Sequence, residues 1–221
     1  MNVAAFETSS RPASVALRVE DRTYETVLEG PRAHASDLLP ALERMTREAG
    51  CDDRHVDAIL VGVGPGSYTG LRVGIATAVG LARGFDARLL GIPSGETLAY
   101  RALEPGQEGS LLIDARQQEL YFAHYRRTAN DVEVIEPPTV VAAATAAEKL
   151  RANATILGDE AAAQAAGLTD AQRERLLSDA FPSASALLEL GAMRLETNEA
   201  RAIEAVQPLY LRPFAAKPRR R

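Results

Sequence analysis

Short hydrophobic stretches separated by polar turns run through the first half of the chain. Residues 3–7 and the two alternating stretches 14–19 and 23–28 predict three strands in an antiparallel meander. Apolar residues then recur at helical spacing over residues 33–49, and Gly50 ends this helix. The continuous apolar run 58–63 predicts a strand that is buried on both faces. A glycine-rich turn over residues 64–70 then leads into a helix over residues 71–83, a strand over 88–92 and a helix over 95–103.

The same order of elements begins again after a stretch rich in proline and glycine at residues 104–109, which is the best candidate linker. The pattern predicts strands over residues 111–115, 119–125, 132–135 and 154–157, and a helix over 142–152. Residues 160–166 and 183–197 are typical of helices, and 207–212 form a short closing segment. Meander, helix, strand and helix therefore occur twice along the chain.

A duplicated unit of this kind predicts an α/β protein with the actin-like (ASKHA) fold, made of two ribonuclease H-like halves. We expect an N-terminal domain over residues 1–105 and a C-terminal domain over residues 106–221. The last segment of the chain would be able to pack back on the first domain.

Composition and charge narrow the class of protein. No apolar run is long enough to span a bilayer and no signal peptide is recognisable, so we expect a cytoplasmic protein without membrane contact. The net charge of −5 repels a nucleic-acid backbone, except at the basic cluster 217–221, which is interpreted as a solvated terminus. The single cysteine, Cys51, excludes an internal disulfide.

The glycine-rich turn carries Gly64, Gly66 and Gly70 but fits no known phosphate or nucleophile motif. A P-loop needs a lysine after its last glycine, and Leu71 stands there. The glycine spacing also differs from the dinucleotide pattern and from the hydrolase elbow. A tight structural turn is one interpretation. Because helix N-terminal amides attract anions, weak nucleotide binding at Gly64, Gly66 and Ser67 is the other.

Small residues fill much of the helix that follows the turn. Close approach of a second helix is one consequence of such a surface, and internal packing alone is the alternative. Together with the preceding helix, it predicts a partner-binding face. The contact positions that we predict share small or apolar side chains on these two helices, and they are Leu39, Leu42, Val73, Ala76, Thr77 and Gly80.

Catalytic chemistry has little support in the remaining residues. The only histidines are His34, His55 and His124, none close enough to another to form a helical metal-ligand pair. A serine–histidine–acid arrangement has no local signature. Glu7 and Asp114 end matching strands, where acids can hold nucleotide and magnesium, but such acids more often accept hydrogen bonds from turn amides. We therefore predict no metal, no cofactor and no catalytic residue in this chain.

The sequence GPGSYTGLRVGIATAVGLA at residues 64–82 resembles the central motif of the TsaB (YeaZ-like) family and its paralogue TsaD. The resemblance spans nearly the whole chain. FETSSRPASVAL from Phe6 is similar to the family's opening, residues 34–42 to its first helix and IDARQQELYFAHY from Ile113 to the start of its second half. PLYLR from Pro208 is similar to the closing motif of TsaB rather than TsaD.

Two positions depart from the family patterns. Glu7 replaces the usual aspartate, which weakens any nucleotide role at that strand. Ser94 and Leu98 stand where TsaD carries the histidine pair that binds its catalytic metal. The resemblance therefore implies a non-catalytic paralogue of TsaD.

The resemblance also implies a function. TsaD would transfer a threonylcarbamoyl group from its adenylate to an adenosine beside the tRNA anticodon, and a TsaB-like chain would pair with it through its two N-domain helices. TsaE would join as an ATPase, ATP and metal would belong to the partner subunits, and tRNA would be reached only through the complex. A homodimer through the same face would form when TsaD is missing. The alternatives are a stand-alone actin-like phosphotransferase and a peptidase-like protein.

Overall fold

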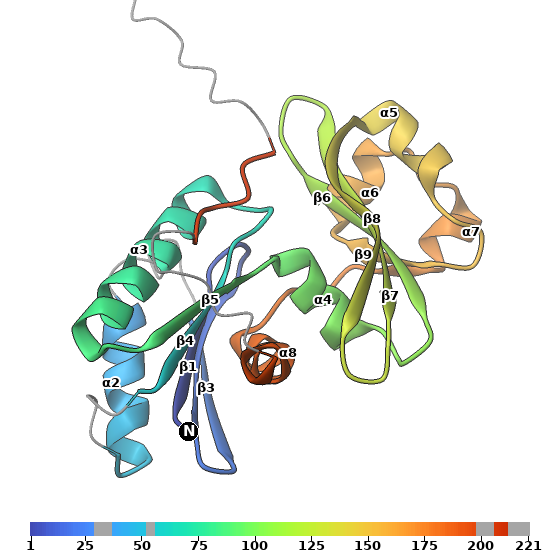
Figure 1. The fold of residues 1–221 in the computed structure, drawn as a ribbon. Coiled ribbons are helices and arrows are strands. Elements are labelled where there is room, and N and C mark those ends of the chain that lie inside the picture. The colour runs from blue at the N-terminus through green and yellow to red at the C-terminus, as the bar shows by residue number, and fades with distance from the viewer. Residues whose placement is uncertain (29–36, 52–55, 198–205, 212–221) are drawn as a thin grey trace, which may run out of the picture.

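The computed structural model describes residues 1–28, 37–51, 56–197 and 206–211, which form two lobes built around separate five-stranded sheets (Figure 1). The strands of the first sheet are β1 (Val3–Glu7), β2 (Ala13–Val19), β3 (Arg22–Leu28), β4 (Ala58–Gly62) and β5 (Arg88–Ile92). Their order is β3-β2-β1-β4-β5. The pairs β1–β2 and β2–β3 are antiparallel, whereas β1–β4 and β4–β5 are parallel.

Helices cover both faces of the first sheet. The helices α2 (Leu38–Glu48) and α3 (Tyr68–Phe85) lie on one face, and α8 (Ala184–Glu196) lies on the other (Figure 1). Strand β1 is buried throughout because its side chains alternate between these layers. Phe6 joins the core beneath α2 and α3, and Val3 joins the core beneath α8.

The second sheet repeats the topology of the first. Its strands are β6 (Glu108–Asp114), β7 (Glu119–Arg127), β8 (Val132–Ala142), β9 (Thr155–Gly158) and β10 (Leu176–Leu177). Their order, β10-β9-β6-β7-β8, is the first order in reverse, with the two antiparallel and two parallel pairs in equivalent places. The prediction of two ribonuclease H-like halves in an actin-like fold is confirmed.

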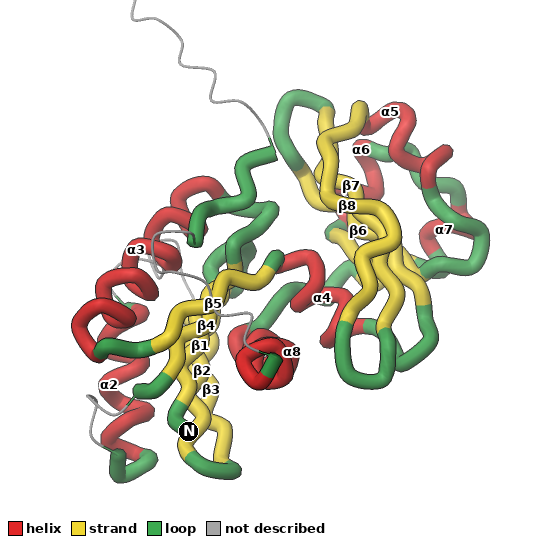
Figure 2. The backbone as a smooth tube through the Cα atoms, in the orientation of Figure 1, coloured by secondary structure: helices red, strands yellow, loops and turns green. Residues whose placement is uncertain are grey.

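Short helices of the second half cover one face of this sheet, and a helix from the first half covers the other face. One core lies between the sheet and the short helices α5 (Ala143–Ala146), η1 (Ala147–Lys149) and α6 (Glu160–Ala165), and α7 (Asp170–Arg173) follows them. The opposite face, with Leu111 and Tyr125, packs on α4 (Ser94–Ala102). Figure 2 shows α4 and α8 side by side between the two sheets.

The halves thus exchange a helix. Helix α4 precedes the second sheet in the sequence but packs on it, and α8 follows the second sheet but packs on the first. At the start of α8, the Ala184 N–H donates a hydrogen bond of 2.7 Å to Ser14 Oγ on β2. The predicted boundary between residues 105 and 106 falls in the turn between α4 and β6.

A buried ion-pair cluster joins the lobes beside this crossing. Arg194 Nη2 on α8 lies 2.6 Å from Glu96 Oε2 on α4 and 2.7 Å from Asp131 Oδ1 in the β7–β8 turn. The Arg194 and Glu96 side chains are largely buried, whereas half of the Asp131 side chain is exposed. The same guanidinium therefore holds together elements of both lobes.

Several predicted bounds in the second half were wrong. Strand β8 extends well past residue 135, through Pro137 and Pro138. Prolines are tolerated there because β8 is an edge strand and lacks a neighbour on one side. The helix predicted over residues 142–152 breaks into α5 and the 3₁₀ turn η1, and the candidate linker 104–109 is shortened because β6 begins at Glu108.

No helix within the described ranges combines the length and the apolar character that crossing a bilayer requires.

Candidate functional site

The glycine-rich turn connects β4 to the N-terminus of α3. Ser67 is the N-cap of α3, and its Oγ accepts a hydrogen bond of 3.2 Å from the Gly70 N–H. The Ser67 N–H donates a hydrogen bond of 2.7 Å to the Ser9 carbonyl oxygen. Such an N-cap contributes about 1 kcal/mol to helix stability, so Ser67 stabilises the start of α3.

The glycines of this region allow the turn between β1 and β2 to lie directly against α3. A methyl group at Gly66 would overlap the Ser9 carbonyl oxygen, and one at Gly70 would overlap the Thr8 carbonyl oxygen. Thr8 Oγ1 donates a hydrogen bond of 2.8 Å to the Gly70 carbonyl oxygen. Close approach thus explains these glycines, and phosphate binding at Gly64, Gly66 and Ser67 stays a prediction.

Glu7 lies behind this turn and is fully buried. Its Oε1 accepts hydrogen bonds from the Ser9 N–H at 2.8 Å and from the Ser94 hydroxyl at 3.2 Å. Its Oε2 has no hydrogen-bond partner among the described residues and lies against Gly62, where a methyl group would overlap the carboxyl group. Burial raises the pKa of Glu7 above its ordinary value, because desolvation outweighs these hydrogen bonds.

The two strand-end acids both accept hydrogen bonds from turn amides, as the sequence interpretation favoured. Glu7 does so from Ser9, and Asp114 Oδ1 accepts a hydrogen bond of 2.7 Å from the Arg116 N–H. Asp114 also lies 3.4 Å from the exposed Arg116 guanidinium. Each acid thereby closes its own β-turn.

The solvent-facing side of α3 carries a row of residues with little or no side chain, which we call the bare row. Ala76, Gly80 and Gly84 are exposed at four-residue intervals, so they form one row along the helix. A methyl group added at Gly80 or Gly84 would have no described atom within 4 Å. Figure 1 shows α3 beside α2 on the side of the first lobe that faces away from the second lobe. A row of small residues lets another helix approach closely.

The predicted contact positions divide by exposure. Ala76 and Gly80 are exposed, whereas Val73 and Thr77 are partly buried beside them. On α2, Leu39 is 52% exposed, whereas Leu42 is 5% exposed and packs in the core. Leu42 therefore supports the face from beneath and does not offer its side chain to a partner. These positions stay predictions as contacts.

The residues considered for metal binding are dispersed. His34 and His55 lie outside the described residues, and His124 is buried in the second sheet. Ser94 and Leu98 are buried on α4, where Ser94 Oγ also accepts a hydrogen bond of 3.2 Å from the Gly64 N–H. Within the described ranges, no group of three or more histidine, cysteine, aspartate or glutamate side chains is arranged to hold a metal ion.

A serine, a histidine and a glutamate do come together in the second sheet, which sequence reasoning missed. Ser110 Oγ lies 3.0 Å from His124 Nδ1, and His124 Nε2 lies 2.9 Å from Glu108 Oε2. The signal available was cross-strand: Ser110 and His124 are register partners on β6 and β7. Because Ser110 is 0% exposed, no substrate can reach its hydroxyl, and Ser110 and His124 form a buried polar pair that reaches the surface only through the partly exposed Glu108.

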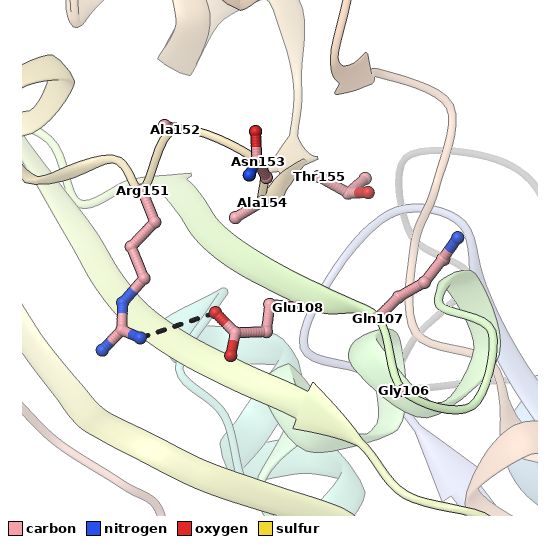
Figure 3. A pocket seen from close by; sticks show the side chains of 8 residues that line it. All are labelled: Gly106, Gln107, Glu108, Arg151, Ala152, Asn153, Ala154 and Thr155. Carbon is pink, nitrogen blue, oxygen red and sulfur yellow. Dashed lines mark hydrogen bonds and ion pairs between the residues drawn. The ribbon is translucent and has the colours of Figure 1, made fainter.

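Glu108 connects this network to a surface hollow of about 460 Å³ (Figure 3). Figure 3 shows Arg151 pointing toward Glu108, at an Nη1–Oε2 distance of 3.5 Å. Arg126 Nη2 lies 2.6 Å from the other carboxylate oxygen. The acid of this hollow is thus neutralised by its neighbours and offers little free charge to a ligand.

We expect the Glu108→Gln variant to change the pH dependence of stability. Hydrogen bonds from His124 and then Arg126 lower the pKa of Glu108 from 4.5 to about 2. A lowered pKa in the folded state stabilises the protein above the unfolded value, and this contribution disappears as the pH falls from about 4.5 toward about 2. The wild type should therefore exceed Glu108→Gln in unfolding free energy at neutral pH, and the difference should close over this range.

Urea unfolding at a series of pH values measures this difference. Glu43→Gln is a matched control, because Glu43 forms an exposed ion pair with Arg47 at 2.8 Å. Exposed pairs contribute about 0–1 kcal/mol, so the control should follow the wild type closely. An equal gap between wild type and Glu108→Gln at neutral pH and at low pH would contradict the prediction.

The whole chain is similar in sequence to proteins of known families. The family model described as TsaD, tRNA N6-adenosine threonylcarbamoyltransferase, matches residues 29–217. The tRNA threonylcarbamoyladenosine biosynthesis protein TsaB of Escherichia coli K12 is 30% identical over 96% of this chain and 95% of its own length. The protein of that name from Bacillus subtilis is 30% identical over 68% of this chain and 66% of its own length.

A solved structure has the same fold over the whole chain. YeaZ from Pseudomonas aeruginosa is 28% identical to this chain, covers 95% of it and 99% of its own chain, and superposes with a TM-score of 0.82. The fold is therefore common to this chain and a solved relative.

Proposed function

The chain belongs to the TsaB family of tRNA threonylcarbamoyladenosine biosynthesis proteins, and on that premise we propose that it is the non-catalytic partner of a TsaD-like subunit. In this role it would pair with and support the threonylcarbamoyltransferase that modifies the adenosine beside the tRNA anticodon. The match of the TsaD family model over residues 29–217 agrees with a pair of related subunits.

One observation carries this proposal, the bare row on α3. Ala76, Gly80 and Gly84 expose a row of small residues that no described part of the chain covers. A partner helix can approach such a row closely, and few charges would have to be desolvated on contact. The exposed Leu39 on the neighbouring α2 adds apolar surface. We propose that these two helices pack against two helices of the catalytic subunit.

The reaction itself is proposed to take place in the partner. At the positions where TsaD has metal-binding histidines, this chain has Ser94, which is hydrogen-bonded to Glu7, and Leu98, which packs in the core. Neither side chain offers the imidazole nitrogen that such a site uses. We therefore assign ATP and metal to the partner subunits and no cofactor to this chain.

We also propose further partners of this chain and the compartment in which the complex works. A TsaE-like ATPase would join the pair, and tRNA would meet this chain within the assembled complex. The free chain would form a homodimer through the same face when the catalytic subunit is missing. The complex would work in the cytoplasm.

Reconstitution tests the proposed function. The purified chain is mixed with its cognate TsaD-like and TsaE-like proteins, the threonylcarbamoyl-adenylate synthase, tRNA and ATP, and the modified nucleoside is measured by mass spectrometry. We expect modification to require this chain. Equal modification without it would refute the proposed role, and ATP turnover by the isolated chain would then test the phosphotransferase alternative.

A further inference from the structure

A hollow of about 290 Å³ lies where α4, α8 and the end of β7 meet, and we call it the junction hollow. Figure 2 shows α4 and α8 side by side between the two sheets. The walls of the hollow thus come from helices that pack on different sheets. Two cations and two anions line it, and they are Arg101, Arg127, Glu104 and Glu189.

The four charged side chains of the junction hollow are unpaired. Among the residues that the structure describes, none of the four forms an ion pair. The hollow around Glu108 differs, because there Arg151 Nη1 lies 3.5 Å and Arg126 Nη2 lies 2.6 Å from carboxylate oxygens of Glu108. Charges that neutralise one another offer little to a ligand, whereas unpaired charges attract a ligand of opposite sign.

Arg127 is a buried cation without a counter-ion. The residue is only 7% exposed. Its Nε donates a hydrogen bond of 3.3 Å to the Tyr100 carbonyl oxygen, and its Nη1 donates to the carbonyl oxygens of Thr128 and Asp131. Its guanidinium carbon lies 3.7 Å from the centre of the Tyr100 ring. None of these contacts uses Nη2 or supplies a full negative charge. Because a buried unpaired charge is costly, a bound anion would stabilise this arginine.

Other polar groups of the junction hollow are held in place by contacts within the chain. Arg101 Nη1 donates a hydrogen bond of 2.7 Å to the Phe181 carbonyl oxygen, and its guanidinium carbon lies 4.7 Å from the centre of the Phe181 ring. Ser183 Oγ lies 3.1 Å from Ser185 Oγ and accepts a hydrogen bond of 3.3 Å from the Ala186 N–H. A second cation and two hydroxyls are therefore already positioned for a ligand, which lowers the entropic cost of binding.

The size and the charges of the junction hollow limit what it can bind. Sites for drug-sized ligands occupy about 300–1,000 Å³, so this hollow suits a smaller molecule. The two glutamates repel phosphate groups and nucleic-acid backbones. A ligand that carries one carboxylate and one ammonium group matches both signs of charge in the lining. The α-amino acids have this size and this pair of charges.

We propose that the junction hollow binds a free α-amino acid, with its carboxylate on Arg127 and its ammonium group on Glu104 or Glu189. This inference is independent of the proposed function, because it uses no part of the α2 and α3 surface. Since α4 and α8 pack on different sheets, the bound amino acid would connect the two lobes. Binding to the folded chain alone would stabilise it against unfolding.

Isothermal titration calorimetry of the full chain with each of the standard amino acids tests this proposal. We expect at least one of them to bind, and acetate and inorganic phosphate to bind at least about ten-fold more weakly. At roughly ten times its dissociation constant, the tightest amino acid should raise the midpoint of thermal unfolding by about 3–5 °C. The absence of binding by every amino acid, or equal binding of acetate or phosphate, would overturn the proposal.

Variants test whether the amino acid binds in the junction hollow. Arg127→Met should weaken its binding by at least about ten-fold, whereas Arg151→Met, in the hollow around Glu108, should bind like the wild type. The double variant Glu104→Gln/Glu189→Gln changes two exposed residues and serves equally if Arg127→Met fails to fold. It should weaken binding of the amino acid without weakening binding of acetate. Unchanged affinity for the amino acid in either folded variant would overturn the proposal.

Discussion

The Ala76→Glu variant is expected to abolish both pairing with the catalytic subunit and tRNA modification in the reconstituted reaction. Ala76 is exposed at the N-terminal end of the bare row on α3, with Gly80 one turn further along the helix. A glutamate there would place a charge and added volume where a partner helix must come close. Burying an unpaired carboxylate costs several kcal/mol, so pairing should weaken by at least about a thousand-fold.

The folding of this variant should be almost unchanged, because position 76 faces solvent in the free chain. Surface substitutions of this kind usually alter stability by about 0.5 kcal/mol or less. Ala161→Glu on α6 is the matched control: it makes the same change at an exposed alanine of the second lobe and should leave pairing and activity intact. A folded Ala76→Glu protein that still pairs and supports modification would show that α3 is not the contact face.

The largest effect on stability is expected from Arg194→Met. This change keeps the length of the side chain but removes the guanidinium that lies 2.6 Å from the largely buried Glu96, and it also removes the contact with Asp131. Breaking a buried ion pair by removing one partner costs about 3–5 kcal/mol. Urea or thermal unfolding should show a loss of this size, which is a large share of a typical domain's stability.

The double variant Glu96→Leu/Arg194→Met tests whether the loss of stability comes from the broken ion pair or from lost packing of the Arg194 side chain. Replacing both charges with apolar groups should recover much of the stability that Arg194→Met loses, because both members of the buried ion pair are then apolar. Arg47→Met is the control, since the Arg47–Glu43 pair is exposed and contributes about 0–1 kcal/mol. If Arg194→Met unfolds with the same free energy as Arg47→Met, the cluster does not stabilise the lobes as its burial indicates.

The alternation of apolar and polar residues was sufficient to predict most strands. Strands β1 and β5 have the predicted bounds, and β2 and β3 each begin one residue earlier than predicted. β1 is buried on both faces and is mainly apolar, whereas β3 alternates because only part of it is buried. The repeat of the element order was sufficient to predict the duplicated topology.

Features that depend on contacts between distant segments could not be predicted. Nothing local to α4 or α8 shows that each packs on the other half's sheet, because both are simply helices with apolar residues. The Ser110–His124–Glu108 network depends on the register of β6 and β7. Tyr68 and Tyr210, whose ring centroids lie 5.4 Å apart, are distant in the sequence, and periodicity carries no information about such pairs.

The placement of α8 also has a consequence for how the chain is made. As the chain emerges from the ribosome, the strands of the first sheet come out early, but α8 covers their second face only after Glu196 has emerged. Until then the apolar side chains of Val3, Ala5 and Leu60 face solvent. We therefore expect the two lobes to complete folding together late in translation, with the nascent first lobe a natural client for chaperones.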